Sequence, residues 1–142
     1  MLVRLLYASR ATAPLDAAIL DSIMDQSRRN NSRHGITGLL CHSEDIFLQV
    51  IEGGRDAICD LYNRIVTDTR HTQIRLLTYD EIAERHFGGW TMGQVNTARV
   101  NPLLLLKHSE KATLDPFSGP GAASMALLSE LIATASVVNR SE

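Results

Sequence analysis

Alternating hydrophobic positions mark the start of the chain as a β-strand. Within residues 2–9, Val3, Leu5 and Tyr7 occupy every second position, and in a strand such positions share one face. That face is therefore predicted to lie against the core. Tyr7 falls near the end of the strand, where a tyrosine ring commonly packs in the core with its hydroxyl group at the rim. The hydroxyl group could also bond a polar side chain on a neighbouring strand.

The next pattern has helical spacing and predicts a helix over about residues 15–30 with one buried face. Its row of positions four apart consists of Leu15, Ile19, Ile23, Ser27 and Asn31. Asn31 is thus expected to leave the end of the helix on the buried side. The pair Asn30–Asn31 is also typical of a helix C-cap, because asparagine tolerates the left-handed conformation.

Two apolar runs separated by three polar residues predict a β-hairpin. The runs are Ile36–His42 and Ile46–Ile51, and Gln49 interrupts the second of them. A side-chain amide has four hydrogen-bonding positions, and each one left unpaired in a core costs on the order of 1–3 kcal/mol. Gln49 is therefore expected either to pair with neighbouring backbone or to face a polar group. Together with Asn31 in the same apolar layer, it favours a flat polar heterocycle.

A second helix is predicted over about residues 55–68, and two more strands are expected at Ile74–Tyr79 and Trp90–Val95. The helix has an apolar stripe made of Ile58, Leu61, Tyr62 and Ile65. The resulting order, βαββαββ with short connections, is typical of the α+β class. It predicts a ferredoxin-like αβ sandwich with two helices on one face of the sheet.

Residues 98–142 are predicted to form a helical extension beyond a domain of residues 1–97. Pro102 suits the first turn of a short helix, and Pro116–Gly121 is a strong helix breaker. The stretch Ala122–Val138 is apolar over much of its circumference. It is expected to cover the other sheet face or to contact another subunit, as an output or oligomerisation element.

The composition limits the function classes. A chain of 142 residues with 44% hydrophobic content suffices for one domain with a core. A net charge of −2 gives no basic surface of the kind that nucleic acid needs. We find no signal-peptide pattern and no apolar run near the roughly 20 residues that span a bilayer. Cys41 and Cys59 fit reduced, buried thiols, so the expected location is the cytoplasm.

The sequence contains no motif for catalysis or metal binding. A phosphate-binding loop, a dinucleotide fingerprint and a Gly-x-Ser-x-Gly elbow are all absent. The five histidines include no i, i+4 metal pair. Because no group is predicted to act as a general acid or base, the protein is not expected to be an enzyme.

Six short motifs follow one another along residues 2–97. They are Leu6-Tyr7-x-Ser9, Ser27-Arg28-Arg29-Asn30-Asn31, Gly35–Leu40, Phe47–Gly53, Asp68-x-Arg70-His71 and Arg85-x-Phe87-x-x-Trp90-x-Met92. Each motif alone is weak, but the ordered set at these intervals is specific. Together they resemble the BLUF family, blue-light sensors that use flavin.

The resemblance implies a flavin held without a covalent bond between the two helices, expected to be FAD, with FMN or riboflavin as alternatives. It assigns Asn31 to the pyrimidine edge of the ring, where a primary amide matches the N3–H group and the C4 carbonyl. It assigns Arg64 to the C2 carbonyl. Ile23 and Ile65 would sandwich the ring, although ordinary core residues show the same spacing.

The same resemblance adds polar residues at the end of each helix to the predicted cofactor site. Asp68, Arg70 and His71 match family positions near the ring or its side chain. A charged helix end that makes ordinary salt bridges explains these three equally well. Ser27 and Asn30, on the first helix, are assigned to the same site.

In the implied mechanism, Tyr7 gives an electron to the light-excited flavin and its proton follows through Gln49. The amide of Gln49 is then left rotated or tautomerised. Trp90 and Met92 are expected to share a face of the last strand and to pass the signal to the tail. Core packing also explains a tryptophan close to a methionine.

The resemblance further implies output through a separate effector protein and a homo-oligomeric receptor. A cyclic-di-GMP phosphodiesterase and a response-regulator-like protein are the partner types expected, with no nucleic-acid or membrane partner. Two alternatives stay open. A light-independent ferredoxin-like binding module would lack flavin colour, and a flavoenzyme would let NAD(P)H reduce its flavin.

Overall fold

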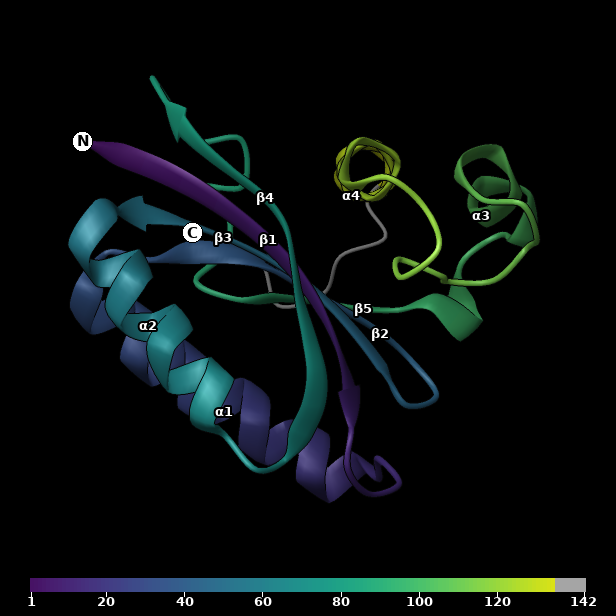
Figure 1. Cartoon of the computed structure of the whole chain (residues 1–142), viewed down its shortest axis with the longest axis horizontal. Coiled ribbons are helices and arrows are strands. Elements are labelled where there is room, and N and C mark those ends of the chain that lie inside the picture. Colours follow the sequence, from purple (N-terminus) through teal and green to yellow (C-terminus); the bar gives the residue numbers. More distant parts are fainter. Residues whose placement is uncertain (135–142) are drawn as a thin grey trace.

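The computed structural model describes residues 1–134, which form a five-stranded sheet with helices on both faces (Figure 1). The first seven elements follow the predicted order βαββαββ. The elements are β1 (Leu2–Ala11), α1 (Ala17–His34), β2 (Thr37–Ser43), β3 (Ile46–Gly54), α2 (Arg55–Thr67), β4 (His71–Ile82), β5 (Gly93–Asn96), a 3₁₀ turn η1 (Thr97–Arg99), α3 (Pro102–His108) and α4 (Gly121–Ala133).

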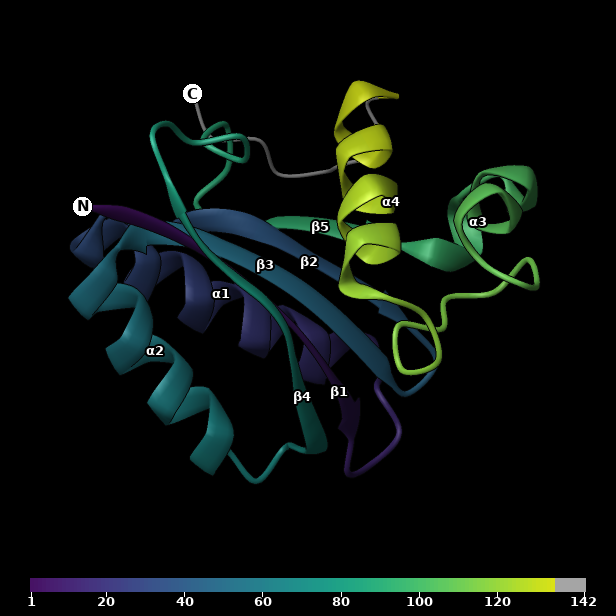
Figure 2. The same cartoon turned by 45° about the horizontal axis from the view of Figure 1, so that its top comes forward.

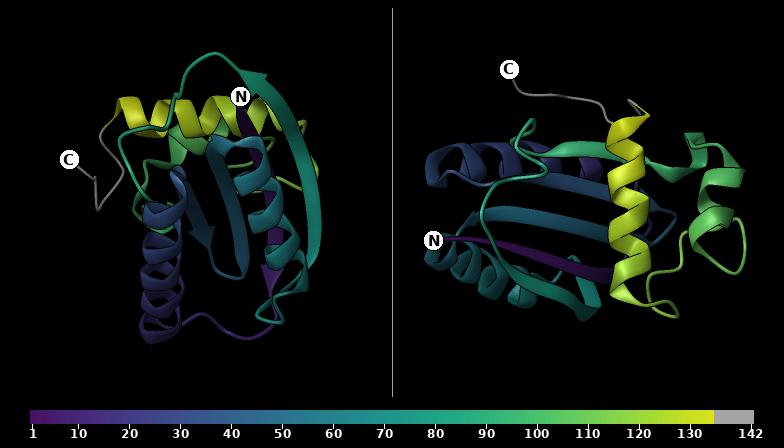
Figure 3. Two further views of the ribbon diagram at one scale, coloured as in Figure 1. Left: turned by 90° about the vertical axis from the view of Figure 1, so that its left-hand side faces the viewer. Right: turned by 90° about the horizontal axis from the view of Figure 1, so that it is seen from above.

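The sheet has the strand order β4-β1-β3-β2-β5. All neighbouring strands are antiparallel except β2 and β5, which are parallel. Helices α1 and α2 lie against one face, and α4 crosses the strands on the opposite face, with α3 beyond it (Figures 2 and 3). The predicted α+β, ferredoxin-like fold is therefore confirmed.

The sheet divides the core into two layers, and successive side chains of β1 pack alternately in one layer and the other. Val3 and Leu5 pack in the layer under α1 and α2, whereas Leu6 and Ala8 pack in the layer that contains Leu128 of α4. Since a strand points successive side chains to opposite faces, the odd positions of β1 face the helix pair, as the sequence pattern predicted.

Two glycines are required by the backbone around β2. Gly35 caps α1 with a φ of 65°, in the left-handed region that glycine adopts without strain. A Cβ atom at Gly38 would overlap the carbonyl oxygen of Val50 on β3. The interpretation of Asn30–Asn31 as the helix cap is thus wrong, because α1 continues to His34 and its cap is Gly35.

Several element boundaries differ from the predicted ones. β4 is longer than the predicted run Ile74–Tyr79, because it pairs along most of the length of β1. β5 begins only at Gly93, so the first three residues of the predicted strand Trp90–Val95 are irregular. α4 ends at Ala133, and the last predicted helical residues, up to Val138, lie outside the described residues.

The two cysteines have different environments. Both are free, and Cys41 is buried in β2 as predicted, but Cys59 is exposed on α2. The expectation of two buried thiols is therefore wrong for Cys59. It follows Ile58, which faces the core, and the next position of a helix turns about 100° away from that direction.

Within residues 1–134, no helix is long and apolar enough to cross a membrane. The same residues contain no group of three or more His, Cys, Asp or Glu side chains placed to hold a metal ion.

The packing of α4 onto the sheet can be tested by removing a buried side chain. Leu128 is fully buried between α4 and the sheet, so Leu128→Ala should lower the free energy of unfolding by about 2–5 kcal/mol. Leu76→Ala on β4 is the matched control, because this leucine is 52% exposed and its loss should change stability by less than about 0.5 kcal/mol. Chemical denaturation measures both. Equal, small effects would mean that α4 does not pack on the sheet.

Candidate functional site

A cavity of about 340 Å³ lies between α1, α2 and the face of the sheet that these helices cover. Its size is at the lower end of the range of small-molecule sites, roughly 300–1,000 Å³. It is lined by every residue that the sequence assigned to a cofactor: Tyr7, Ile23, Ser27, Asn30, Asn31, Gln49, Arg64, Ile65, Asp68, Arg70 and His71. The structure thus brings together residues from two helices and three strands at one concave site.

Four further residues line the cavity and were not predicted as site residues: Gln26, Leu40, Phe47 and Leu61. The sequence pattern contained signals for two of them. Gln26 is three residues after Ile23 and four before Asn30, a spacing that places it on the same helix face. Phe47 is two residues before Gln49 on β3 and therefore shares its face.

Tyr7 and Gln49 form the polar contact at the floor of the cavity. They are direct partners in the antiparallel β1–β3 register, and both are buried. The Tyr7 hydroxyl group donates to Gln49 Oε1. Gln49 Nε2 donates to the Met92 sulfur atom at 3.3 Å. Because the amide bonds two side chains, the expectation that Gln49 pairs with neighbouring backbone is wrong.

Burial fixes the protonation state of this tyrosine. It raises the pKa of Tyr7 well above its ordinary value, with smaller contributions from the negative charge of Asp68 and from Tyr62. A buried phenolate would lose its hydration without gaining a cation. Tyr7 is thus a neutral hydrogen-bond donor at physiological pH, and Gln49 is the acceptor of its proton.

Asn31 presents one satisfied and one unsatisfied end. It lies in the last turn of α1, lines the cavity and is 1% exposed. Its Nδ2 donates to the carbonyl oxygen of Thr91 at 2.7 Å. Its Oδ1 is buried and has no hydrogen-bond partner among the described residues. A buried acceptor left unpaired costs about 1–3 kcal/mol, so this atom fits a ligand that brings a donor into the cavity.

Asn30 and Arg64 connect the two helices at the cavity. Arg64 Nη2 of α2 donates to Asn30 Oδ1 of α1 at 3.1 Å. The Nδ2 atom of Asn30 is buried without a partner among residues 1–134. Asn30 therefore contributes a buried donor and Asn31 a buried acceptor to the lining of one cavity, and a ring that carries both an acceptor and a donor suits them.

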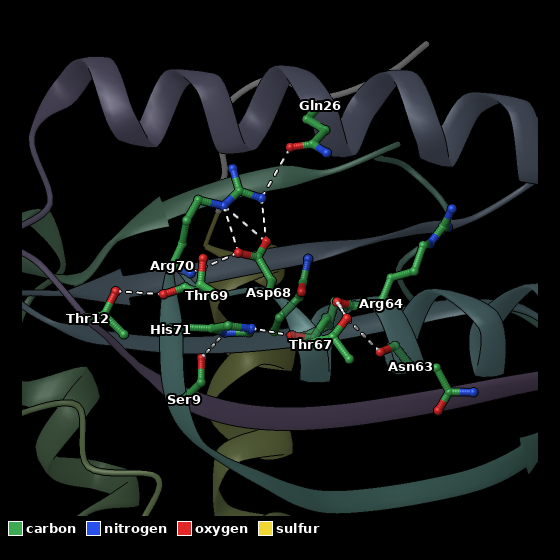
Figure 4. A network of polar contacts seen from close by, with 12 residues as sticks. Ser9, Thr12, Gln26, Asn63, Arg64, Thr67, Asp68, Thr69, Arg70 and His71 are labelled. Carbon is green, nitrogen blue, oxygen red and sulfur yellow. Dashed lines mark hydrogen bonds and ion pairs between the residues drawn. The ribbon is translucent and has the colours of Figure 1, made fainter.

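Asp68 and Arg70 form an ion pair on the cavity wall after α2 (Figure 4). Arg70 Nε donates to both carboxylate oxygens at 3.0 Å, and its Nη2 also reaches Gln26 of α1 at 3.2 Å. The hydrogen bond from the Arg70 side chain holds the pKa of Asp68 below its ordinary value, against partial burial. The predicted salt bridge at the helix end is therefore present, and because the same two residues line the cavity, their predicted contact with a cofactor stays a prediction.

His71 begins β4 and has a partner at each ring nitrogen (Figure 4). Its Nε2 lies 2.5 Å from the carbonyl oxygen of Ile65, and its Nδ1 lies 2.8 Å from Ser9 Oγ. A carbonyl oxygen can only accept, so Nε2 donates to Ile65. The two contacts of the ring join α2, β1 and β4 at the cavity.

Trp90 and Met92 do not share a face. Met92 is fully buried in the core layer under α1 and α2, beside Gln49, whereas Trp90 packs against the layer under α4. The predicted shared strand face is wrong, because both residues precede β5 and the alternation rule holds only inside a strand. Their segment is held by the Asn31 bond to Thr91 and by the Gly38 amide, which donates to the Trp90 carbonyl at 3.0 Å.

Glu52 was not predicted as a site residue, yet it anchors the loop that carries Trp90 and Met92. It is fully buried at the end of β3. Its carboxylate accepts from Arg4 Nε at 2.8 Å and from the backbone amides of His86 and Phe87 at 3.0 and 2.5 Å. An acidic residue directly after an apolar run is the sequence signal that could have identified it, because a buried carboxylate needs several donors.

Comparison with known proteins identifies the family. The model of the BLUF family, described as sensors of blue-light using FAD, matches residues 2–93. Photoactivated adenylate cyclase subunit beta of Euglena gracilis is 38% identical over 92 residues, which are 64% of this chain and 11% of that protein. The chain thus spans about a tenth of the length of the curated relatives it matches.

Solved structures with the same fold extend the likeness over the tail. BlsA in its photo-activated state has a TM-score of 0.82 at 27% identity, covering 100% of this chain and 99% of BlsA. BlrB, a BLUF protein in the dark state, has a TM-score of 0.80 at 33% identity, covering 94% and 96%. BlrP1 of Klebsiella pneumoniae, solved with FMN and cyclic diGMP, has a TM-score of 0.70 at 30% identity, covering 95% and 35%. The chain belongs to the BLUF family of blue-light sensors that use FAD.

Proposed function

We propose that this chain is a blue-light receptor that holds FAD without a covalent bond in the cavity between α1 and α2. In this proposal, light changes the hydrogen bonds of Gln49, and the change reaches the C-terminal helices through the segment of Trp90 and Met92. The observation that carries the proposal is the chain of contacts from Tyr7 through Gln49 to Met92 at the cavity.

The cavity residues suit an isoalloxazine ring. The free Oδ1 of Asn31 would accept from the ring N3–H group, and Arg64 would donate to the C2 carbonyl. Ile23 of α1 and Ile65 of α2 would contact the two faces of the ring. BlrP1 was solved with FMN, which supports FMN and riboflavin as alternative ligands of the same ring site.

The remaining polar residues would hold the ring edge or the ribityl chain. Asp68 and Arg70 are already paired, which fixes the direction of their free hydrogen-bonding positions. Ser27 and Asn30 lie on the α1 side of the cavity, and His71 is on the strand side. None of these positions calls for a covalent link to the cofactor.

Bound in this cavity, a light-excited flavin would supply a strong oxidant. Tyr7 would be the electron donor, and its phenolic proton would move toward Gln49 Oε1 along the hydrogen bond that already joins them. After the electron and the proton had returned to Tyr7, Gln49 would be left with its amide rotated or tautomerised, so that its Nε2 would no longer donate to Met92.

The energy of this switch is small but sufficient. Exchanging one or two hydrogen bonds is worth about 1–3 kcal/mol, which shifts a two-state equilibrium roughly 5- to 150-fold. The receiving element would be the irregular segment before β5. A changed contact at Met92 would alter the placement of Trp90 against the α4 layer, and residues 98–142 would carry the signal onward from the domain of residues 1–97.

The output would be a separate effector protein, with the receptor itself not an enzyme. Two relatives support the type of effector rather than its separation from the receptor: one is named a photoactivated adenylate cyclase and the other, BlrP1, was solved with cyclic diGMP, and this chain covers 11% and 35% of them. A cyclic-di-GMP phosphodiesterase or a response-regulator-like protein would be such an effector. Leu103 and Leu106 on α3 are 69% and 47% exposed, which supports a homo-oligomer. A cytoplasmic location completes the proposal.

The proposal is tested by the visible spectrum of protein purified in the dark and then given a blue flash. We expect a flavin spectrum that moves slightly to longer wavelength and returns in darkness, because Gln49 would donate to the ring C4 carbonyl only after light. A colourless protein that takes up no added flavin would support the light-independent binding module. A flavin that light leaves unmoved but NAD(P)H reduces would support a flavoenzyme.

Removing the phenol separates flavin binding from photochemistry. Tyr7→Phe should keep the flavin and lose the light-induced shift, since no other described side chain donates to Gln49 Oε1. Tyr62→Phe is the matched control, because its ring centroid is 6.0 Å from that of Tyr7 but it makes no bond to Gln49. Flash spectroscopy measures both variants. A normal photocycle in Tyr7→Phe would contradict the mechanism.

The raised pKa of Tyr7 predicts the pH dependence of the response. An ordinary tyrosine titrates near pH 10, but burial keeps Tyr7 protonated beyond that pH. The amplitude of the light-induced shift should therefore stay constant from about pH 6 to about pH 10. The preference for the neutral phenol stabilises the fold below pH 10 and is lost as pH rises toward the folded pKa. An amplitude that falls with a midpoint near 10 would mean that the phenol is solvated.

A further inference from the structure

One side chain joins the cavity to the segment between Trp90 and Met92. Asn31 has its Nδ2 on the carbonyl oxygen of Thr91 at 2.7 Å, while its Oδ1 is buried without a partner among the described residues. The two ends belong to one planar amide, so the direction of one hydrogen bond fixes the direction of the other. Whatever binds Oδ1 therefore influences the bond to Thr91.

The bond to Thr91 holds the chain between two residues that pack in opposite core layers. The neighbours of Thr91 are Trp90, packed in the layer under α4, and Met92, which accepts from Gln49 in the opposite layer. The segment is irregular and lies just before β5. A bond to the Thr91 carbonyl thus acts where the chain crosses from one core layer to the other.

We propose that Asn31 is a positioning residue that couples occupancy of the cavity to the backbone at Thr91, independently of Gln49. A ring N3–H group on Oδ1 would hold the amide plane and strengthen the Nδ2 bond to Thr91. The segment of residues 90–92 would then respond to the presence of FAD in the dark, as well as to light through Gln49. This inference rests on the proposed function, since it takes FAD as the ligand.

The coupling is reciprocal by thermodynamic linkage. If FAD strengthens the bond to Thr91, then an intact bond to Thr91 must favour FAD by the same factor. The coupling involves one hydrogen bond to a backbone carbonyl, and the loss of such a bond changes a local opening equilibrium about five-fold. Asn31 is also 1% exposed, so bulk solvent has little access to either end of its amide.

Asn30 provides a matched control on the same helix turn. It lines the same cavity and also carries one buried amide atom without a described partner. Its bonded atom, Oδ1, accepts from Arg64 rather than reaching residues 90–92. Asn30→Ala should therefore weaken retention of FAD without loosening the segment.

The test is amide hydrogen exchange of residues 90–95, measured in the dark on FAD-free protein and on protein loaded with excess FAD. In the wild type, FAD should slow exchange about five-fold. Asn31→Ala should exchange about five-fold faster than the wild type without FAD, and added FAD should not slow it. Asn30→Ala should behave like the wild type in both states. Asn31→Asp keeps an acceptor but cannot donate to Thr91, so it should follow Asn31→Ala even when FAD is bound.

The outcomes separate this inference from the proposed function. The coupling is overturned if FAD slows exchange in Asn31→Ala as much as in the wild type, or if neither Asn31 variant speeds exchange. The photoreceptor proposal would still hold in that case if the protein shows a normal light-induced spectral shift. If FAD binds and slows exchange only through Asn31 but light moves no spectrum, the photoreceptor proposal fails and the coupling holds.

Discussion

The hydrogen bond between Tyr7 and Gln49 is the constraint on which the site depends. A polar amide in the middle of an apolar strand is tolerated only with partners, and the β1–β3 register supplies one by placing Tyr7 directly opposite. A slip of either strand by one residue would turn its own side chain to the α4 face and separate Tyr7 from Gln49. The close approach of Gly38 to the backbone of Val50 secures the neighbouring β2–β3 pair in the same sheet. The pairing register of the sheet therefore sets the relative positions of Tyr7 and Gln49.

A second buried polar group, Glu52, positions the loop that follows β4. Its carboxylate binds Arg4 and two backbone amides of that loop, so the loop is fixed at one end by charge-assisted bonds. Trp90 and Met92 follow within a few residues and point into opposite core layers. A change at the cavity can therefore reach the α4 side without passing through the sheet itself.

Family membership and the geometry of the cavity give different information about the site. The family match covers residues 2–93, and the family it identifies senses blue light with FAD. The cavity adds what the match does not contain: which amide atoms are already bonded and which are free. Asn31 shows the distinction best, because its Nδ2 is bonded to the Thr91 carbonyl and its Oδ1 has no partner among the described residues.

The amino-acid sequence was enough to predict the order of the elements and the shared face of the odd positions in β1, because local periodicity encodes them. Its motifs, through their resemblance to the BLUF family, also predicted the residues assigned to the cofactor, although Gln26, Leu40, Phe47 and Leu61 line the same cavity and were missed. The sequence could not place Trp90 and Met92, since their two-residue spacing implies a shared face only if a strand forms there, and β5 starts at Gly93. Nor did it reveal the role of Glu52, whose partners lie more than thirty residues away along the chain. Long-range hydrogen bonds decide such features, and only the tertiary structure brings their donors and acceptors together.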